Sequence, residues 1–228
     1  MTLQTRCLIL DHDDTAVDST ASIHYPAHLE IMRRMRPGSE PISLDGWFKK
    51  NFHPGIMEYL VDELKFTGDE LEEELAIWRD FTRSRIPRFY PGFIEMLQAF
   101  KSRGGIVTVV SHSEVENIEA HYRQADSTGT AFPDAVFGWT SDAGKRKPDP
   151  YPVHQILKRF DLQEEEVLIV DDLKPGVAMA QASGVPIAAA GWGHDIPEIR
   201  AYMEAHCGVY LTAVDELKAM VLRSKSSP

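Results

Sequence analysis

The sequence has little of what several protein classes require. Its 228 residues include two cysteines, Cys7 and Cys207, which lie far apart and form no CxxC or Cys/His zinc spacing. Cys7 opens an apolar segment, so we interpret it as a buried thiol. No run approaches the roughly 18 apolar residues of a transmembrane helix, and the apolar run near the N-terminus is too short for a signal peptide. We therefore expect a soluble, cytoplasmic protein.

Positive charge is also scarce. The formal net charge of −11 argues against nonspecific binding to nucleic acid or to an anionic membrane. It also means that an anionic substrate needs local help, from a metal or from a few well-placed Lys and Arg side chains. The 43% of hydrophobic residues is enough to build a proper core. We expect no nucleic-acid or membrane partner, and a monomer or a homodimer.

Short apolar runs recur along the chain and predict a parallel sheet. Continuous apolar runs of this length are typical of strands buried on both faces. Helical patterns separate them: Ser113 and Glu116 form a capping-box pattern before one helix, and Gly184 ends another. This alternation predicts an α/β fold with a doubly wound parallel sheet. The strands are expected at residues 7–10, 105–110, 135–139, 167–170, 185–190 and 208–212.

One interval, residues 11–104, breaks this alternation. It contains no convincing strand and is far longer than a βαβ crossover needs. It carries four helical patterns, at about residues 26–36, 43–52, 55–65 and 68–85. The last begins with a capping-box pattern, Thr67 and Glu70, and carries an apolar stripe of Leu71, Leu75, Trp78 and Phe81 or Thr82. We therefore predict an α/β core domain of residues 1–15 and 89–228, with a helical subdomain of residues 16–88 inserted.

Polar side chains follow the predicted strands, at the edge where parallel sheets bind ligands. In chain order they are Asp11, His12, Asp13, Asp14 and Thr15; Ser111, His112 and Ser113; Lys147; Asp171 and Asp172; and Trp192 and His194. If the sheet forms as predicted, several carboxylates, a serine and a lysine converge. Such a cluster implies a hard divalent cation with oxygen ligands, most simply Mg²⁺. Mg²⁺ in turn favours a phosphate substrate.

The same residues resemble the motifs of the haloacid dehalogenase-like (HAD) hydrolase superfamily. The resemblance is to its phosphatase branch with an inserted helical cap, as in phosphoglycolate phosphatases. The four motifs match, in order, Asp11-x-Asp13-x-Thr15, Ser111, Lys147-Pro148 and the segment "VDDLKPGVAMAQASG". Any one of them alone is a weak signal, whereas four in order at strand ends are specific. Two positions depart from the pattern: Asp14 stands where the family often has glycine, and His12 where relatives are often apolar.

The resemblance implies a Mg²⁺-dependent phosphohydrolase that acts on a small phosphorylated metabolite through an aspartyl-phosphate intermediate. Asp11 would be the nucleophile, and it needs no base because a carboxylate is already ionised at neutral pH. Asp13 would protonate the leaving alkoxide and later deprotonate the attacking water. Lys147 would neutralise the nucleophile and the phosphoryl group.

The resemblance also implies the binding residues. The metal would be held by the Asp11 side chain, the Asp13 backbone carbonyl, and Asp172 with or without Asp171. The phosphate would be held by Ser111 and by residues His12, Thr15, His112 and Ser113. In the cap, Lys50 is the candidate substrate contact, with Lys49 and His53 beside it in "GWFKKNFHPG". The alternative there is a solvated turn in which Trp47 and Phe52 pack inside the cap. Trp192 and His194 are further candidates for substrate contact.

Asp13 narrows the choice of activity. The dehalogenases and phosphonatases of this superfamily lack a carboxylate at that position, so its presence points to a phosphate monoester. A phosphomutase of sugar phosphates shares the same residues and stays open. A catalytically idle HAD-fold binding protein is the alternative from another class, although intact Asp11 and Asp13 argue against it. A bacterial receiver domain has its acidic pair before the phosphorylated aspartate and about half this length, which disfavours it.

Overall fold

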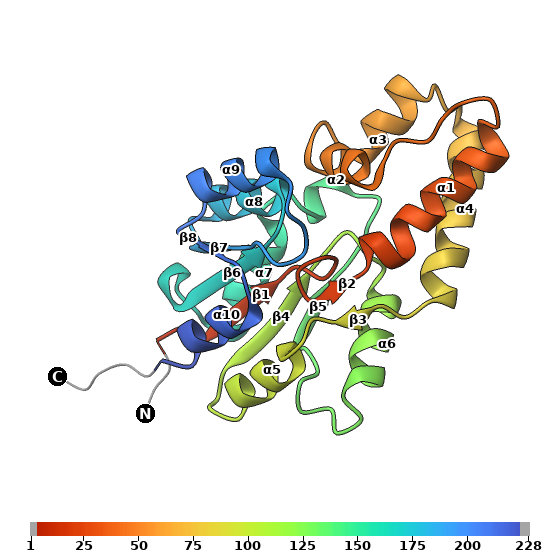
Figure 1. Ribbon diagram of the computed structural model, residues 1–228. Coiled ribbons are helices and arrows are strands. Elements are labelled where there is room, and N and C mark those ends of the chain that lie inside the picture. Colours follow the sequence, from red (N-terminus) through yellow and green to blue (C-terminus); the bar gives the residue numbers. More distant parts are fainter. Residues whose placement is uncertain (1–3, 224–228) are drawn as a thin grey trace. The chain divides into compact units, whose positions relative to one another are not determined.

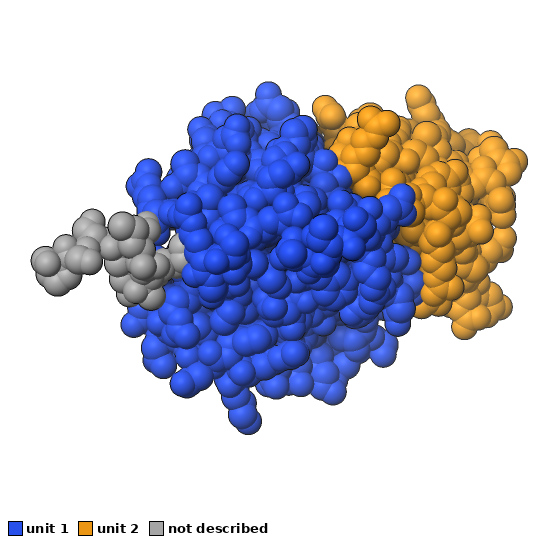
Figure 2. Space-filling model, turned by 90° about the horizontal axis from the view of Figure 1, so that it is seen from below, with its two compact units in different colours: residues 1–17, 89–228 blue, residues 18–88 orange. Residues whose placement is uncertain are grey.

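The computed structural model describes residues 4–223, and the chain divides into two compact units (Figure 1, Figure 2). The core unit holds the residues up to Val17 and from Phe89 onward, and the cap unit holds residues 18–88. Around these two boundaries the chain forms the short strands β2 (Val17–Asp18) and β3 (Arg88–Phe89), which pair with each other. The sequence did not predict these strands, because two residues are too few to show a periodic pattern.

The core unit contains a parallel sheet with the strand order β5-β4-β1-β6-β7-β8. Its strands are β1 (Cys7–Leu10), β4 (Ile106–Val110), β5 (Ala135–Phe137), β6 (Val167–Asp171), β7 (Ile187–Ala190) and β8 (Val209–Leu211). In the register, Leu10 of β1 lies opposite Val109 of β4 and Val170 of β6, so these three strands end at nearly the same level. The predicted α/β fold with a parallel sheet is confirmed.

Helices cover both faces of this sheet. They are α5 (Phe93–Lys101), α6 (Val115–Ala125), α7 (Tyr151–Phe160), α8 (Lys174–Ser183), α9 (Pro197–His206) and α10 (Val214–Val221), with 3₁₀ turns η3 (Ala143–Lys145) and η4 (Glu164–Glu166). Phe93 of α5 and Leu217 of α10 pack in one apolar cluster with Leu8 of β1. Successive strand residues point to opposite faces, so Ile9 faces the other layer, and it is equally buried. Burial of both faces explains why the strands read as continuous apolar runs.

The cap unit is helical and has an apolar core of its own. Its elements are the π-helical turn η1 (Thr20–His24), α1 (Tyr25–Met35), α2 (Leu44–Phe52), α3 (Ile56–Glu58), the π-helical turn η2 (Tyr59–Glu63) and α4 (Gly68–Ser84). The helix expected at residues 55–65 is therefore divided into α3 and η2. The predicted capping box before α4 is confirmed, because Thr67 and Glu70 each accept a hydrogen bond from the other's backbone N–H. Within residues 4–223, no helix has both the length and the hydropathy needed to cross a bilayer.

The capping box predicted at Ser113 is wrong. Helix α6 begins at Val115, and Glu114 is its N-cap residue without a side-chain cap hydrogen bond. The Ser113 hydroxyl instead donates to the Asp13 carboxylate over 2.6 Å. In a capping box the hydroxyl accepts from a backbone N–H, whereas here it donates to a carboxylate that comes from a distant part of the sequence.

The apolar stripe predicted on α4 is displaced. The most buried side chains of the helix are Glu74, Ile77 and Thr82. Leu71 and Phe81 of the predicted stripe pack at the margin of the cap core. A carboxylate therefore lies on the buried face, which an analysis by hydrophobic periodicity could not anticipate.

Candidate active site

The central strands β4, β1 and β6 lie side by side (Figure 1), so the candidate residues that follow them are neighbours. Asp11 follows β1, which lies between β4 and β6. Ser111 follows β4, and Asp171 is the last residue of β6. The backbone N–H of Asp11 donates to the Val170 carbonyl over 2.9 Å, which extends the ladder into the site. The site is thus built on rigid strand ends.

Lys147 links two of the carboxylates. Its Nζ donates to Asp11 Oδ1 over 2.6 Å and to Asp171 Oδ2 over 2.9 Å, and the lysine side chain is 5% exposed. Burial alone would lower the pKa of Lys147, but the two carboxylates raise it above its ordinary value. Burial raises the pKa of Asp11 well above its usual range, and Lys147 opposes this only in part. The lysine is charged at neutral pH, but one positive charge does not balance the site.

Three buried carboxylates, those of Asp11, Asp171 and Asp172, each offer an oxygen within 4.8 Å of the others. Burial and the Asp171 charge raise the pKa of Asp172 well above its usual range. Its Oδ1 accepts from Thr15 Oγ1 over 3.4 Å. Within the described part of the chain, its Oδ2 is buried and accepts no hydrogen bond. A buried excess of negative charge with a spare carboxylate oxygen fits a divalent cation with oxygen ligands.

Glycine in the fourth motif allows α8 to approach this cluster. A Cβ atom at Gly176 would lie 2.1 Å from Asp171 Cγ. No side chain fits at that distance, so the helix packs directly against the aspartate. The Asp171 Oδ1 atom also accepts from the Leu173 backbone N–H over 3.0 Å. Asp171 is thereby fixed from two sides.

The serines after β4 contact Asp13. Its Oδ2 accepts from Ser113 Oγ over 2.6 Å and lies 3.4 Å from Ser111 Oγ. The backbone N–H of Ser113 donates to Ser111 Oγ over 3.1 Å. The sequence predicted phosphate contacts for both serines, and it contained no signal for their contact with Asp13.

Two histidines that follow β4 and β1, His112 and His12, make contacts beside the carboxylate cluster. His112 Nε2 lies 2.9 Å from the Lys147 carbonyl oxygen, and burial lowers the pKa of His112 to about 4, so its neutral ring donates this bond. The His12 side chain is fully buried, with its Nε2 2.9 Å from His121 Nδ1. It packs edge-on against the Phe89 ring. Both side chains thus stabilise the polypeptide around the site.

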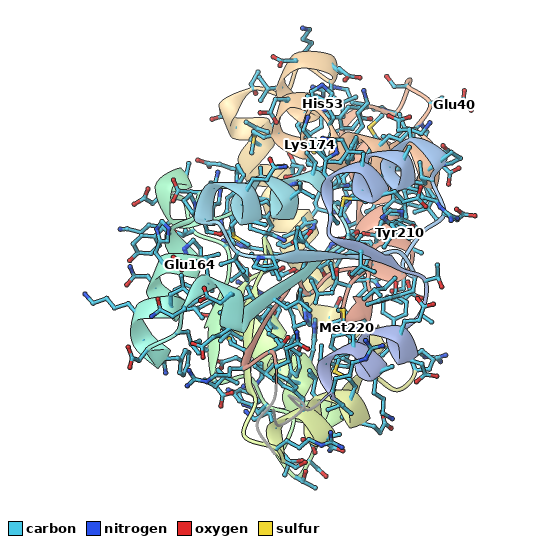
Figure 3. All side chains as sticks on the ribbon, turned by 90° about the vertical axis from the view of Figure 1, so that its left-hand side faces the viewer. Glu40, His53, Glu164, Lys174, Tyr210 and Met220 are labelled. Atoms are coloured by element: carbon cyan, nitrogen blue, oxygen red, sulfur yellow. The ribbon has the colours of Figure 1, made fainter. Side chains whose placement is uncertain are left out.

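Two lysines outside the carboxylate cluster have other contacts. In the cap unit, Lys50 Nζ lies 2.5 Å from Glu63 Oε1 and 5.4 Å from the ring centroid of Tyr59. In the core unit, Lys174 at the start of α8 (labelled in Figure 3) lies 5.7 Å from the ring centroid of Tyr202. The predicted substrate contact of Lys50 stays a prediction.

Trp192 and His194, the two further candidates after β7, contact residues of the first and fourth motifs. Trp192 Nε1 donates to the Thr15 carbonyl oxygen over 3.0 Å. The His194 side chain is almost completely buried, and its Nε2 lies 3.3 Å from Asp172 Oδ2. Burial lowers the pKa of His194, although the Asp14 and Asp195 carboxylates act in the opposite direction.

A model of the haloacid dehalogenase-like hydrolase family matches residues 5–184. This match includes all four motifs and most of the chain. The chain belongs to the haloacid dehalogenase-like hydrolase family. The four motifs of this HAD hydrolase carry the side chains that meet at the strand ends.

Curated relatives narrow the class of this HAD hydrolase. It is 24% identical over 195 residues to phosphoglycolate phosphatase 1 of Pseudomonas aeruginosa. The aligned region covers 83% of this chain and 71% of the relative. It is 22% identical over 228 residues to the phosphoglycolate phosphatase of Nitrosospira multiformis. That aligned region covers 97% of this chain and 98% of the relative. The prediction of a HAD-type phosphatase is confirmed.

Solved structures show the same fold. A haloacid dehalogenase-like hydrolase from Bacteroides fragilis superposes with a TM-score of 0.77, at 18% identity, over 93% of this chain and 99% of that one. At this identity the likeness concerns the fold alone.

Proposed function

We propose that this HAD phosphatase hydrolyses a small phosphorylated metabolite, with Mg²⁺, through an aspartyl-phosphate on Asp11. The observation that carries the proposal is the arrangement around Asp11. Lys147 donates to Asp11 and Asp171, while Asp172 Oδ2 is buried and, among the described residues, accepts no hydrogen bond. Asp11 is thus a nucleophile beside the positive charge of Lys147. Asp172 Oδ2 is available as a metal ligand.

The residues present fit a bound Mg²⁺. Asp11, Asp172 and the backbone carbonyl of Asp13 would hold it, and when bound it supplies positive charge that a phosphate ester needs in this acidic site. Asp171 is assigned a different task, because Lys147 and the Leu173 N–H already occupy its two oxygens. It orients the lysine toward Asp11.

The chain's own residues then perform the transfer. Asp11 attacks phosphorus, while Lys147 lowers the repulsion between the carboxylate and the phosphoryl oxygens. Asp13 gives its proton to the leaving alkoxide and afterwards takes a proton from the water that attacks the aspartyl-phosphate. The hydroxyls of Ser111 and Ser113, both near Asp13 Oδ2, hold this side chain in place between the two steps.

The relatives support a first choice of substrate. Both curated relatives named above are phosphoglycolate phosphatases, so 2-phosphoglycolate is the ester to test first, beside sugar phosphates. A small metabolite of this class also agrees with a cytoplasmic location, which we include in the proposal.

Phosphate release from a panel of phosphate esters tests this function. We expect turnover of p-nitrophenyl phosphate and of at least one small metabolite ester with Mg²⁺, and none after treatment with EDTA. Asp11→Asn is the control, and it abolishes both. Absence of turnover over the whole panel with Mg²⁺ present would overturn the proposal.

A rapid-quench experiment tests the intermediate. With ³²P-labelled p-nitrophenyl phosphate, whose leaving group needs no proton, Asp13→Asn should accumulate label on the protein, because hydrolysis of the aspartyl-phosphate lacks its base. Asp11→Asn should carry no label. Movement of label to a second hydroxyl of a sugar phosphate, with little free phosphate, would instead show a mutase.

A further inference from the structure

The loop after β7 is fixed on the backbone of the first motif. Trp192 Nε1 donates to the Thr15 carbonyl oxygen over 3.0 Å. A Cβ atom at Gly193 would lie 2.2 Å from the Asp14 carbonyl oxygen, so only glycine allows the two segments to approach this closely. The next residue, His194, therefore enters the site from a loop that contains none of the four motifs.

His194 faces the carboxylate of Asp172. The Nε2 atom lies 3.3 Å from Asp172 Oδ2, and the two side chains are 6% and 2% exposed. The other oxygen of Asp172 accepts from the Thr15 hydroxyl. The carboxylate is thus confined between the first motif on one side and the β7–α9 loop on the other.

Asp14 belongs to the same group of residues. It is buried, with a positive φ of 56°, and its carbonyl oxygen is the atom that a Cβ at Gly193 would meet. The sequence indicated no task for Asp14 beyond a turn or an indirect contact with the site. The backbone of Asp14 thus lies against the loop that carries His194.

We infer that His194 is a positioning residue of the metal site, which orients Asp172 so that its Oδ2 faces a divalent cation. The inference rests on the proposed function, since it requires that cation. A carboxylate oxygen has two lone pairs, so in the loaded site Oδ2 would accept from the Nε2–H with one and face the metal with the other. In the structure Oδ2 does not accept this hydrogen bond, although the two atoms lie 3.3 Å apart, and such contacts often align only when the site is loaded. Partners of metal ligands typically contribute a factor of about 10 to 100 in metal affinity.

Calorimetric titration of the full chain with Mg²⁺, without substrate, tests the inference. His194→Leu should weaken Mg²⁺ binding about tenfold or more. His194→Gln should largely restore it, because the amide nitrogen of Gln reaches the position of Nε2. His194→Asn should not, because its amide is one methylene shorter. His206→Leu, at an exposed histidine of α9, is the matched control and should bind as the wild type does.

The outcomes separate this inference from the proposed function. Wild-type Mg²⁺ affinity in His194→Leu, or equal affinities of the Gln and Asn variants, would overturn the inference and leave the proposed function standing. A fall in turnover with unchanged Mg²⁺ binding would overturn it too, by assigning His194 to the substrate. A wild-type chain that does not bind Mg²⁺ would overturn both. Because Gln and Asn differ by one methylene, circular dichroism and the melting temperature without metal suffice to show that both variants fold alike.

Discussion

The two units of the chain bury ionisable side chains in opposite ways. In the core unit, Lys147 lies between Asp11 and Asp171 and stays charged, because opposite charges compensate the burial. In the cap unit, His28 stacks on the Trp47 ring with centroids 4.5 Å apart, and neither of its ring nitrogens has a hydrogen-bond partner among the described residues.

Burial acts alone on two groups of the cap unit, His28 and Glu74. It lowers the pKa of His28 to about 4 and raises the pKa of Glu74 to about 7. Lys147 thus keeps its buried charge by pairing, whereas burial without a partner favours the neutral forms of His28 and Glu74. The comparison can be tested in each unit.

Removal of the compensating charge should have the largest effect. We expect Lys147→Met to lower kcat for p-nitrophenyl phosphate by a factor of about 10² to 10³, because a positive charge beside the reacting group is lost. Steady-state kinetics measures this. Lys145→Met, at an exposed lysine two residues earlier that pairs with Asp142, is the control and should keep the wild-type rate. A variant of Lys147 with nearly full kcat would contradict the role of the lysine.

Glu74→Gln should make the cap unit less sensitive to alkaline pH. The pKa of Glu74 is raised in the folded state from 4.5 to about 7, so the stability it contributes is complete below pH 4.5 and is lost as the pH rises through 7. At pH 8 the variant should be more stable than the wild type by up to about 3 kcal/mol, with no difference near pH 4. Urea unfolding at both pH values measures this. The exposed Glu73→Gln is the control, and an equal gain at both pH values would refute the explanation.

His28→Phe should have the opposite pH dependence. The pKa of His28 is lowered in the folded state from 6.5 to about 4, so its contribution is present above pH 6.5 and is lost as the pH falls through 4. Relative to the variant, the wild type should lose about 2 kcal/mol between pH 7.5 and pH 5. The same urea series measures it. His53→Phe, at an exposed histidine of the cap unit (labelled in Figure 3), should unfold like the wild type at both pH values.

Gly176→Ala should have the smallest effect. The new Cβ would lie 2.1 Å from Asp171 Cγ, so α8 has to shift, at a cost of about 1–2 kcal/mol. Gly68 at the start of α4 has no atom within 4 Å of such a Cβ, and Gly68→Ala should be neutral or slightly stabilising. Thermal unfolding of the two variants compares them. Equal melting temperatures would mean that α8 accommodates the methyl group freely.

The sequence allowed much of the core unit to be predicted. Buried parallel strands require continuous apolar runs, and these runs marked all six strands to within two residues at most ends. The polar residues directly after each run were then the candidates for the site. The short pair β2 and β3 was missed, because two-residue strands are held by their partners and not by a local preference. Glu74 was missed for a related reason, since its burial depends on how α4 packs.

By itself, the sequence determined where the strands begin and end and which polar residues follow them, because these depend on apolar runs a few residues long. Only the tertiary structure decided which side chains meet. It directed Ser113 to Asp13 and not to a helix cap, and it brought His194 to Asp172 from a separate loop. The physical reason is that a strand fixes the position of a backbone, whereas the direction of a side chain depends on charges and loops that come from distant parts of the chain.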